Sequence, residues 1–155
     1  MINNEILRQI RYTLDLSDSE MISIFGLADC KITRKEVCDW LKKEEDPSYE
    51  LCNDVILESF LNGLIYEKRG KKDDGAPKVL GLLTNNAIFM KLKIAFNLKA
   101  EEVLEIIALA DFRISKHELS AFFRKESHKH YRGCKDQILR YFLKGLQLKF
   151  RKNAS

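Results

Sequence analysis

The sequence predicts an all-α protein built from two tandem four-helix repeats, eight helices in all, packed with approximate two-fold pseudosymmetry. When the chain is compared with itself at an offset of 82 residues, about 23 of the 67 positions from Asn3 to Arg69 are identical, without a gap. Ordinary residue usage would give roughly 4 such identities. The 155 residues also hold only 7 glycines and 2 prolines, too few for an all-β fold with many turns.

The first two helices of each repeat are predicted from an apolar face and from capping signals. The first helix spans about residues 4–14 with Asn3 as its N-cap, and the second opens at the capping box Ser17-x-x-Glu20. Apolar residues follow at the spacing of one helical face. In the first helix these are Ile6, Leu7, Ile10 and Leu14, matched in the second repeat by Ile88, Phe89, Leu92 and Phe96.

The third and fourth helices carry signals that both repeats share. The third opens at a capping box, Thr33-x-x-Glu36 in one repeat and Ser115-x-x-Glu118 in the other. After a polar bend, the fourth helix is expected from about residue 51 to 66, apolar on more than one side and therefore central. Gly63 and Gly145 lie inside it. Glycine costs up to about 1 kcal/mol in a helix interior, so we expect another helix to pack closely there.

Four pairs of polar residues also occur in both repeats, and structural roles account for each of them. The pairs are Asp29/Asp111, Glu36/Glu118, Tyr49/Tyr131 and Asp54/Asp136. The first pair closes a helix and begins a turn, and the second completes the capping boxes. The tyrosines are expected to pack at the bend with hydrogen-bonded hydroxyls. The last pair stands near the positive end of the fourth helix.

The net charge of +4 is the sum of an acidic first repeat, a nearly neutral linker and a basic second repeat. Residues 1–69 form the first repeat, with 9 Lys/Arg and 14 Asp/Glu, a net charge of −5. Residues 70–83, which contain three glycines and Pro77, form a linker of net charge +1. Residues 84–155 form the second repeat, with 15 Lys/Arg and 7 Asp/Glu, a net charge of +8. The first repeat is therefore acidic and the second basic, and this difference concerns partners rather than fold.

Three stretches carry a resemblance to a known family. They are SFLNGLIYEKRGK at Ser59–Lys71, NNEILRQIRY at the start, and QILRYFLKGL in the second repeat. Together they resemble the YehS-like family of small bacterial proteins with a duplicated domain of unknown function. The resemblance implies a cytoplasmic, all-helical protein of two related domains. It supplies no established activity, substrate or catalytic residue.

The sequence lacks the signatures of common enzymes and of exported proteins. It has no glycine-rich nucleotide loop, no H-E-x-x-H and no G-x-S-x-G. We therefore expect a non-catalytic protein with no cofactor and no metal, although a polar pocket between the repeats, lined by Asp54, Asp136 or Tyr131, would favour an enzyme. The nearest approach to a metal motif is His128-x-His130-x-x-x-Cys134, which has no counterpart in the first repeat. There is no signal peptide or membrane span and no C-x-x-C pair, so a cytoplasmic protein with reduced thiols is expected.

Fourteen basic residues are candidates for binding nucleic acid or another anion. They are Lys68, Arg69, Lys71, Lys72, Arg124, Lys125, Lys129, Arg132, Lys135, Arg140, Lys144, Lys149, Arg151 and Lys152. Histidine and tyrosine are interleaved with the second group and could stack on bases. Alternatively, the group is a solvated helical face, or the basic repeat docks on the acidic one. The cluster at Lys68–Lys72 caps a helix end and could also clamp an anion between the repeats.

Two functions follow as hypotheses. The first is a non-catalytic helical binding or adaptor protein that acts through protein–protein interaction, with a protein partner or with a second copy of itself. The alternative is binding of DNA or RNA through the basic second repeat. Nothing in the sequence indicates a membrane or a small-molecule substrate.

Overall fold

The computed structural model describes residues 1–70 and 81–151, and within them it contains eight helices and no strand. The helices are α1 (Asn3–Leu14), α2 (Asp18–Leu27), α3 (Arg34–Leu41), α4 (Asp54–Arg69), α5 (Asn85–Ala95), α6 (Ala100–Leu109), α7 (Lys116–Phe122) and α8 (Asp136–Phe150). The predicted fold class is therefore confirmed. Residues 71–80 of the expected linker lie outside the described residues. None of the described helices has the length and apolar composition that a membrane span needs.

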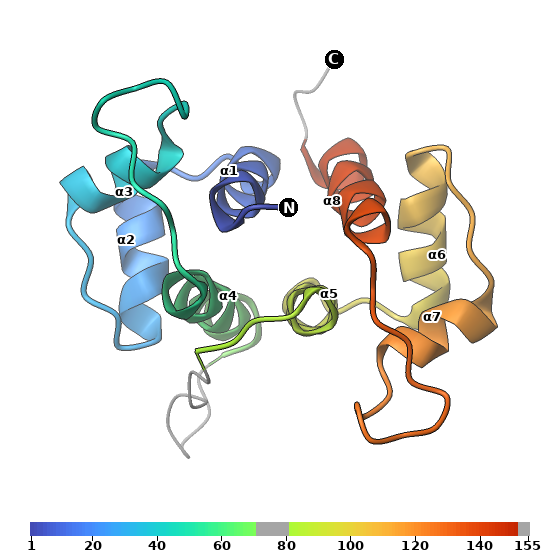
Figure 1. The fold of residues 1–155 in the computed structure, drawn as a ribbon. Helices are drawn as coiled ribbons and strands as arrows, with labels where there is room; N and C mark the ends of the chain where they lie inside the picture. Colours follow the sequence, from blue (N-terminus) through green and yellow to red (C-terminus); the bar gives the residue numbers. More distant parts are fainter. Residues whose placement is uncertain (71–80, 152–155) are drawn as a thin grey trace.

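Helices α1, α4, α5 and α8 form the centre of the molecule and run in the same direction. Figure 1 shows them roughly end-on, with α2 and α3 on one side and α6 and α7 on the other. Hydrogen bonds join their N-terminal ends in pairs. Asn3 Nδ2 of α1 donates to Asp54 Oδ1 of α4 (2.8 Å), and Asn85 Nδ2 of α5 donates to Asp136 Oδ1 of α8 (2.7 Å). At the opposite end, their C-termini line one cleft. Helix α4 packs on α5 as α8 packs on α1, which is the pairing that a pseudo-two-fold axis between the repeats requires.

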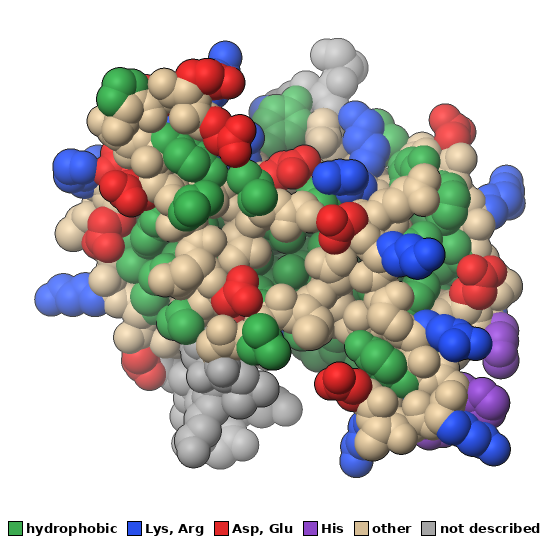
Figure 2. Space-filling model, in the orientation of Figure 1, with side chains coloured by type: hydrophobic (Ala, Val, Ile, Leu, Met, Phe, Trp, Pro, Cys, Tyr) green, Lys and Arg blue, Asp and Glu red, His purple; other side chains and the backbone are tan. Residues whose placement is uncertain are grey.

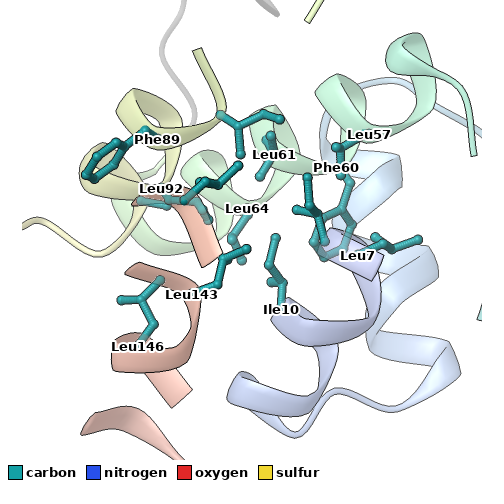
Figure 3. Close-up of a cluster of buried hydrophobic side chains, with 14 of the residues drawn as sticks. Leu7, Ile10, Leu57, Phe60, Leu61, Leu64, Phe89, Leu92, Leu143 and Leu146 are labelled. Atoms are coloured by element: carbon teal, nitrogen blue, oxygen red, sulfur yellow. The ribbon is translucent and has the colours of Figure 1, made fainter. Parts of the chain in front are cut away.

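The two repeats share one hydrophobic core. Figure 3 shows apolar side chains from all four central helices meeting in a single cluster. Leu61 and Leu64 of α4 are 1% exposed, and Leu143 and Leu146 of α8 are 2% exposed. Neither repeat could expose this surface to water without losing the burial that drives folding.

The two helix-interior glycines mark the closest approaches between helices. A Cβ atom on Gly63 would lie 2.0 Å from the carbonyl oxygen of Ile24 in α2, and one on Gly145 would lie 2.0 Å from that of Ile106 in α6. Real Cβ atoms essentially never come within 3.0 Å of another heavy atom in this way. The expected close packing is confirmed, and it is the same in both repeats.

The capping boxes at Ser17, Thr33 and Ser115 are confirmed. The N-cap predicted at Asn3 is wrong: α1 begins one residue earlier, at Asn3 itself, because this side chain bonds across to Asp54 instead. The fourth helix also differs from its predicted range, since it begins at Asp54, capped by Asn53, and continues to Arg69.

Equivalent turns in the two repeats have similar backbone conformations. Asp29 and Asp111 lie two residues after the ends of α2 and α6, in the left-handed region with φ of 57° and 61°, which confirms their predicted place at a turn. Asp and Asn tolerate this conformation better than other residues with a side chain. The expectation for the bend tyrosines is wrong for Tyr49, whose hydroxyl is buried and has no hydrogen-bond partner among the described residues.

A basic surface and a cleft as candidate functional sites

The structure separates the fourteen candidate residues into two groups and leaves three undescribed. Lys71, Lys72 and Lys152 lie outside the described residues. Lys68, Arg69 and Arg151 line the cleft at the C-terminal ends of the central helices. Lys149 is exposed near the same end, over the ring of Phe150. The others belong to the segment before α8 and to α8 itself: Arg124, Lys125, Lys129, Arg132, Lys135, Arg140 and Lys144. We call these seven residues the basic surface.

All seven side chains of the basic surface are exposed, and none forms an ion pair within the described part of the chain. Figure 2 shows the resulting asymmetry: Lys and Arg predominate over the half of the molecule that contains α6–α8, and Asp and Glu over the other half. Cations this exposed are hydrated and available to a partner, whereas paired ones would have to break a contact first.

No ion pair among the described residues joins this surface to the acidic repeat, although Arg140 lines a hollow together with Glu5, Glu44 and Glu45. The ion pairs between the repeats among the described residues join Lys91 to Glu58 (3.8 Å), Arg151 to Asp15 (3.7 Å), and the α-amino group of Met1 to Asp136 (2.5 Å). None of them involves the basic surface. The seven cations of the basic surface are therefore exposed to solvent and form no ion pair with the acidic repeat among the described residues.

The backbone that carries most of the basic surface is held by a half-buried asparagine, a role that sequence reasoning missed. Asn86 Nδ2 donates to the carbonyls of Phe122 (3.0 Å) and Arg132 (2.8 Å), and its Oδ1 accepts from the Cys134 amide (2.8 Å). These three bonds fasten the segment after α7 to the start of α5. The available signal was the identity of Asn86 with Asn4 at the 82-residue offset.

The first repeat builds the same segment with the opposite charge. Asn4 bonds to the carbonyls of Trp40 (2.9 Å) and Glu50 (2.8 Å) and to the amide of Cys52 (2.9 Å), as its counterpart does in the second repeat. Here the exposed side chains are acidic: Glu44, Glu45, Asp46 and Glu50. We call these four the acidic loop. Glu50 occupies the position that Arg132 occupies in the second repeat.

The aromatic residues near the basic surface are already engaged. The ring of Tyr141 stacks on Phe112 with 4.4 Å between centroids and 10° between planes. His128 Nδ1 accepts from the His130 amide (3.0 Å), and the two imidazole rings lie 5.5 Å apart. Tyr131 is half-buried. Contacts with a nucleic acid would therefore fall mainly on its phosphates.

The sequence His128-x-His130-x-x-x-Cys134 does not assemble into a metal centre. The histidines are exposed, whereas Cys134 is buried and its Sγ lies 3.6 Å from the carbonyl of Lys135. Burial raises the pKa of the Cys134 thiol to about 12, so the thiolate that binds metal is disfavoured. No group of three or more potential ligands occurs among the residues described.

The duplicated aspartates at the start of α4 and α8 fasten the repeats together. Asp54 Oδ2 accepts from the backbone amide of Leu83, just before the second repeat (3.1 Å). Asp136 Oδ2 holds the α-amino group of Met1, and these bonds lower the pKa of the Asp136 carboxyl. Met1 and Leu83 are themselves equivalent positions. Both carboxylates are thus committed to structure.

Comparison with known proteins agrees with the duplication. A family model described as "Protein of unknown function (DUF1456)" matches twice, at residues 3–70 and 85–152. The "Uncharacterized protein YehS" of Escherichia coli (strain K12) is 43% identical over 148 residues, which cover 94% of each chain. No solved structure matches this chain. The resemblance read from the sequence is confirmed, and the chain belongs to the DUF1456 family, whose unit it contains twice.

Proposed function

We propose that the protein is a non-catalytic binding protein that acts through protein–protein contact, and that its basic surface docks on an acidic surface of its partner. The observation that carries this proposal is a set of seven exposed cations with no ion-pair partner among the described residues. Complementary potentials of this kind direct encounter and orientation. The cysteines are free thiols, which fits the cytoplasm that we propose as its compartment.

An acidic surface of suitable geometry is present on the chain itself. The acidic loop and the segment from Arg124 to Lys135 have equivalent backbones and opposite charges. In a two-fold dimer, the acidic loop of each protomer faces the basic segment of the other, so the contact is made twice. Self-association in this arrangement is the first form of the proposal to test.

Glu50 and Arg132 allow a charge-swap experiment at equivalent positions. Sedimentation velocity at about 0.05 M and about 0.5 M salt should show a dimer that weakens as salt shortens the Debye length. Arg132→Glu alone, or Glu50→Arg alone, should weaken it, and the two changes in one chain should restore it. A protein that stays monomeric at every concentration, or a dimer indifferent to both substitutions, would contradict self-association.

Binding of nucleic acid through the second repeat is the second candidate function. Arg140 and Lys144 are exposed four residues apart on one face of α8, about 6 Å along the helix, and can neutralise neighbouring phosphates. Fluorescence anisotropy with a labelled duplex and a labelled single strand should show affinity that falls steeply with salt. Arg140→Glu and Lys144→Glu should weaken it, whereas Glu50→Arg should not. No binding at low salt would exclude this candidate.

A further inference from the structure

The central helices end around a cleft that the basic surface does not touch. Its volume is about 800 Å³, and it is lined by the ends of α1, α4, α5 and α8. Ligand sites in proteins commonly enclose about 300–1,000 Å³. The lining residues come in equivalent pairs, such as Leu14 with Phe96 and Asp15 with Asn97. The cleft therefore lies on the pseudo-two-fold axis between the repeats.

Two arginines at equivalent positions line this cleft. Arg69 is the last residue of α4 and Arg151 directly follows α8; the two are equivalent at the 82-residue offset, and both line the cleft. Arg69 is exposed and forms no ion pair among the described residues. Arg151 is more engaged: its guanidinium lies 3.7 Å from Asp15 Oδ1, contacts the Tyr12 ring and donates to the Tyr12 carbonyl, and its Nε is buried with no hydrogen-bond partner in the described part of the chain. The exposed guanidinium of Arg69 therefore has donors that suit an oxyanion, and Arg151 adds positive charge beside it.

The two walls of the cleft have diverged in chemistry. The wall from the first repeat is charged, with Asp15, Glu67 and Lys68. The wall from the second repeat has Phe96 and Phe150, whose ring centroids lie 4.9 Å apart, and Lys68 Nζ lies 5.2 Å from the Phe96 centroid. A ligand with a polar end and an apolar end fits such a site, whereas a symmetric or wholly polar one does not.

The charge of the lining selects among anions. Three cationic side chains (Lys68, Arg69, Arg151) and two anionic ones (Asp15, Glu67) give +3 − 2 = +1. The helix C-termini add partial negative charge at the same end, which disfavours polyanions such as nucleic acid. We propose that this cleft binds a small organic anion that carries one negative charge and an apolar ring, with the charge at Arg69 and Arg151 and the ring against Phe96 and Phe150.

The probe for this test is 1-naphthaleneacetate, a singly charged carboxylate with an apolar ring. Amide chemical shifts of the full chain are followed during titration. We expect saturable shifts that centre on the C-terminal turns of α5 and α8. The neutral isostere 1-naphthaleneacetamide and ring-free acetate should each bind more weakly by about tenfold or more, because each lacks one of the two contacts.

Two substitutions locate the binding. Arg69→Gln should weaken affinity for 1-naphthaleneacetate about tenfold or more while leaving the fold intact, since this side chain is exposed. Arg124→Gln, which removes an exposed arginine of the basic surface, should leave affinity unchanged. The proposal is overturned by an absence of shifts at millimolar probe, by equal affinity in Arg69→Gln, or by a loss that appears in Arg124→Gln instead.

Discussion

At Gly63 the backbone of α4 lies against the backbone of α2, so the position has no room for a methyl group. An added Cβ would meet the Ile24 carbonyl oxygen at 2.0 Å, and backbone cannot turn aside as a flexible side chain can. We expect Gly63→Ala to destabilise the protein by about 1–3 kcal/mol, even though alanine favours helix. Urea unfolding followed by circular dichroism measures the change.

Gly26 provides the matched control within the same pair of helices. It lies in α2 with no atom within 4 Å of an added Cβ, and the second repeat has Ala108 at this position. Gly26→Ala should therefore stabilise the protein by about 0.5–1 kcal/mol, the gain in helix propensity. If both substitutions shifted stability in the same direction, close helix packing would not be the reason for Gly63.

Asp39 should make stability depend on pH in the acid range. Hydrogen bonds from Lys35 (2.6 Å) and Lys42 (3.0 Å) hold the pKa of this carboxyl below its ordinary value of 3.8. A depressed carboxyl pKa stabilises the folded state above the unfolded pKa, and the contribution is lost as pH falls through the folded pKa.

Asp39→Ala tests this dependence, because the second repeat has a buried alanine, Ala121, at the equivalent position. The variant should be less stable than the parent at neutral pH. The difference between their urea midpoints should shrink as pH falls below about 3.8. A difference that stays constant with pH would mean that packing, and not the carboxylate, accounts for it.

At the scale of helices, a polar cluster distinguishes the α4–α5 contact from its pseudosymmetric counterpart, α8–α1. Lys91 of α5 donates to Asn62 Oδ1 (2.7 Å) and lies 3.8 Å from Glu58 Oε2. Glu58 is 4% exposed, and burial lowers the pKa of Lys91. In α8 the equivalents of Glu58 and Asn62 are Arg140 and Lys144. The ion pair therefore belongs to one contact only.

A double-mutant cycle measures what this pair contributes. Lys91→Met removes the cation that lies 3.8 Å from the buried Glu58 carboxylate and should cost about 3 kcal/mol. Adding Glu58→Leu also removes the carboxylate that Lys91 neutralises and should recover part of the loss. Losses that simply add in the double variant would show that the two charges do not interact. The readout is the free energy of unfolding from urea titration.

The elements that the sequence predicted well are those set by neighbouring residues. The capping boxes at Thr33 and Ser115 join residues three apart, so their pattern is visible in the chain. The side chain of Asn3 was misassigned as a cap because its partner, Asp54, is 51 residues away. Likewise the fourth helix begins at Asp54 rather than near residue 51, since Asn53 takes the cap.

Of the two candidate sites, the basic surface could be predicted from the sequence, whereas most of the cleft could not. The excess of cations in the second repeat could be counted directly, and their exposure agrees with a surface role. The possible anion clamp at Lys68–Lys72 anticipated one edge of the cleft, but its full lining could not be predicted because it comes from four separate helix ends. Only the identity of Arg69 and Arg151 at the 82-residue offset hinted that these two residues would share a site.

At the scale of the whole molecule, the two repeats should fold as one cooperative unit. Their core is continuous, and α4–α5 and α1–α8 bury apolar faces that either repeat alone would expose. Trp40, the single tryptophan, lies in the first repeat and is 6% exposed. Its fluorescence therefore reports on the first repeat, whereas circular dichroism reports on all the helices. We expect the two signals to show one coincident thermal transition.

Gly145→Ala tests whether a destabilising substitution in the second repeat also lowers the unfolding temperature of the first. The substitution disturbs α8 against α6, wholly within the second repeat. If the repeats unfold together, the midpoint reported by Trp40 should fall by about 2–4 °C for each kcal/mol lost, and by as much as the midpoint seen by circular dichroism. If the repeats were independent domains, the Trp40 transition would stay in place while circular dichroism split into two steps. A shared shift would show that the central helices couple the acidic and basic repeats into a single folding unit.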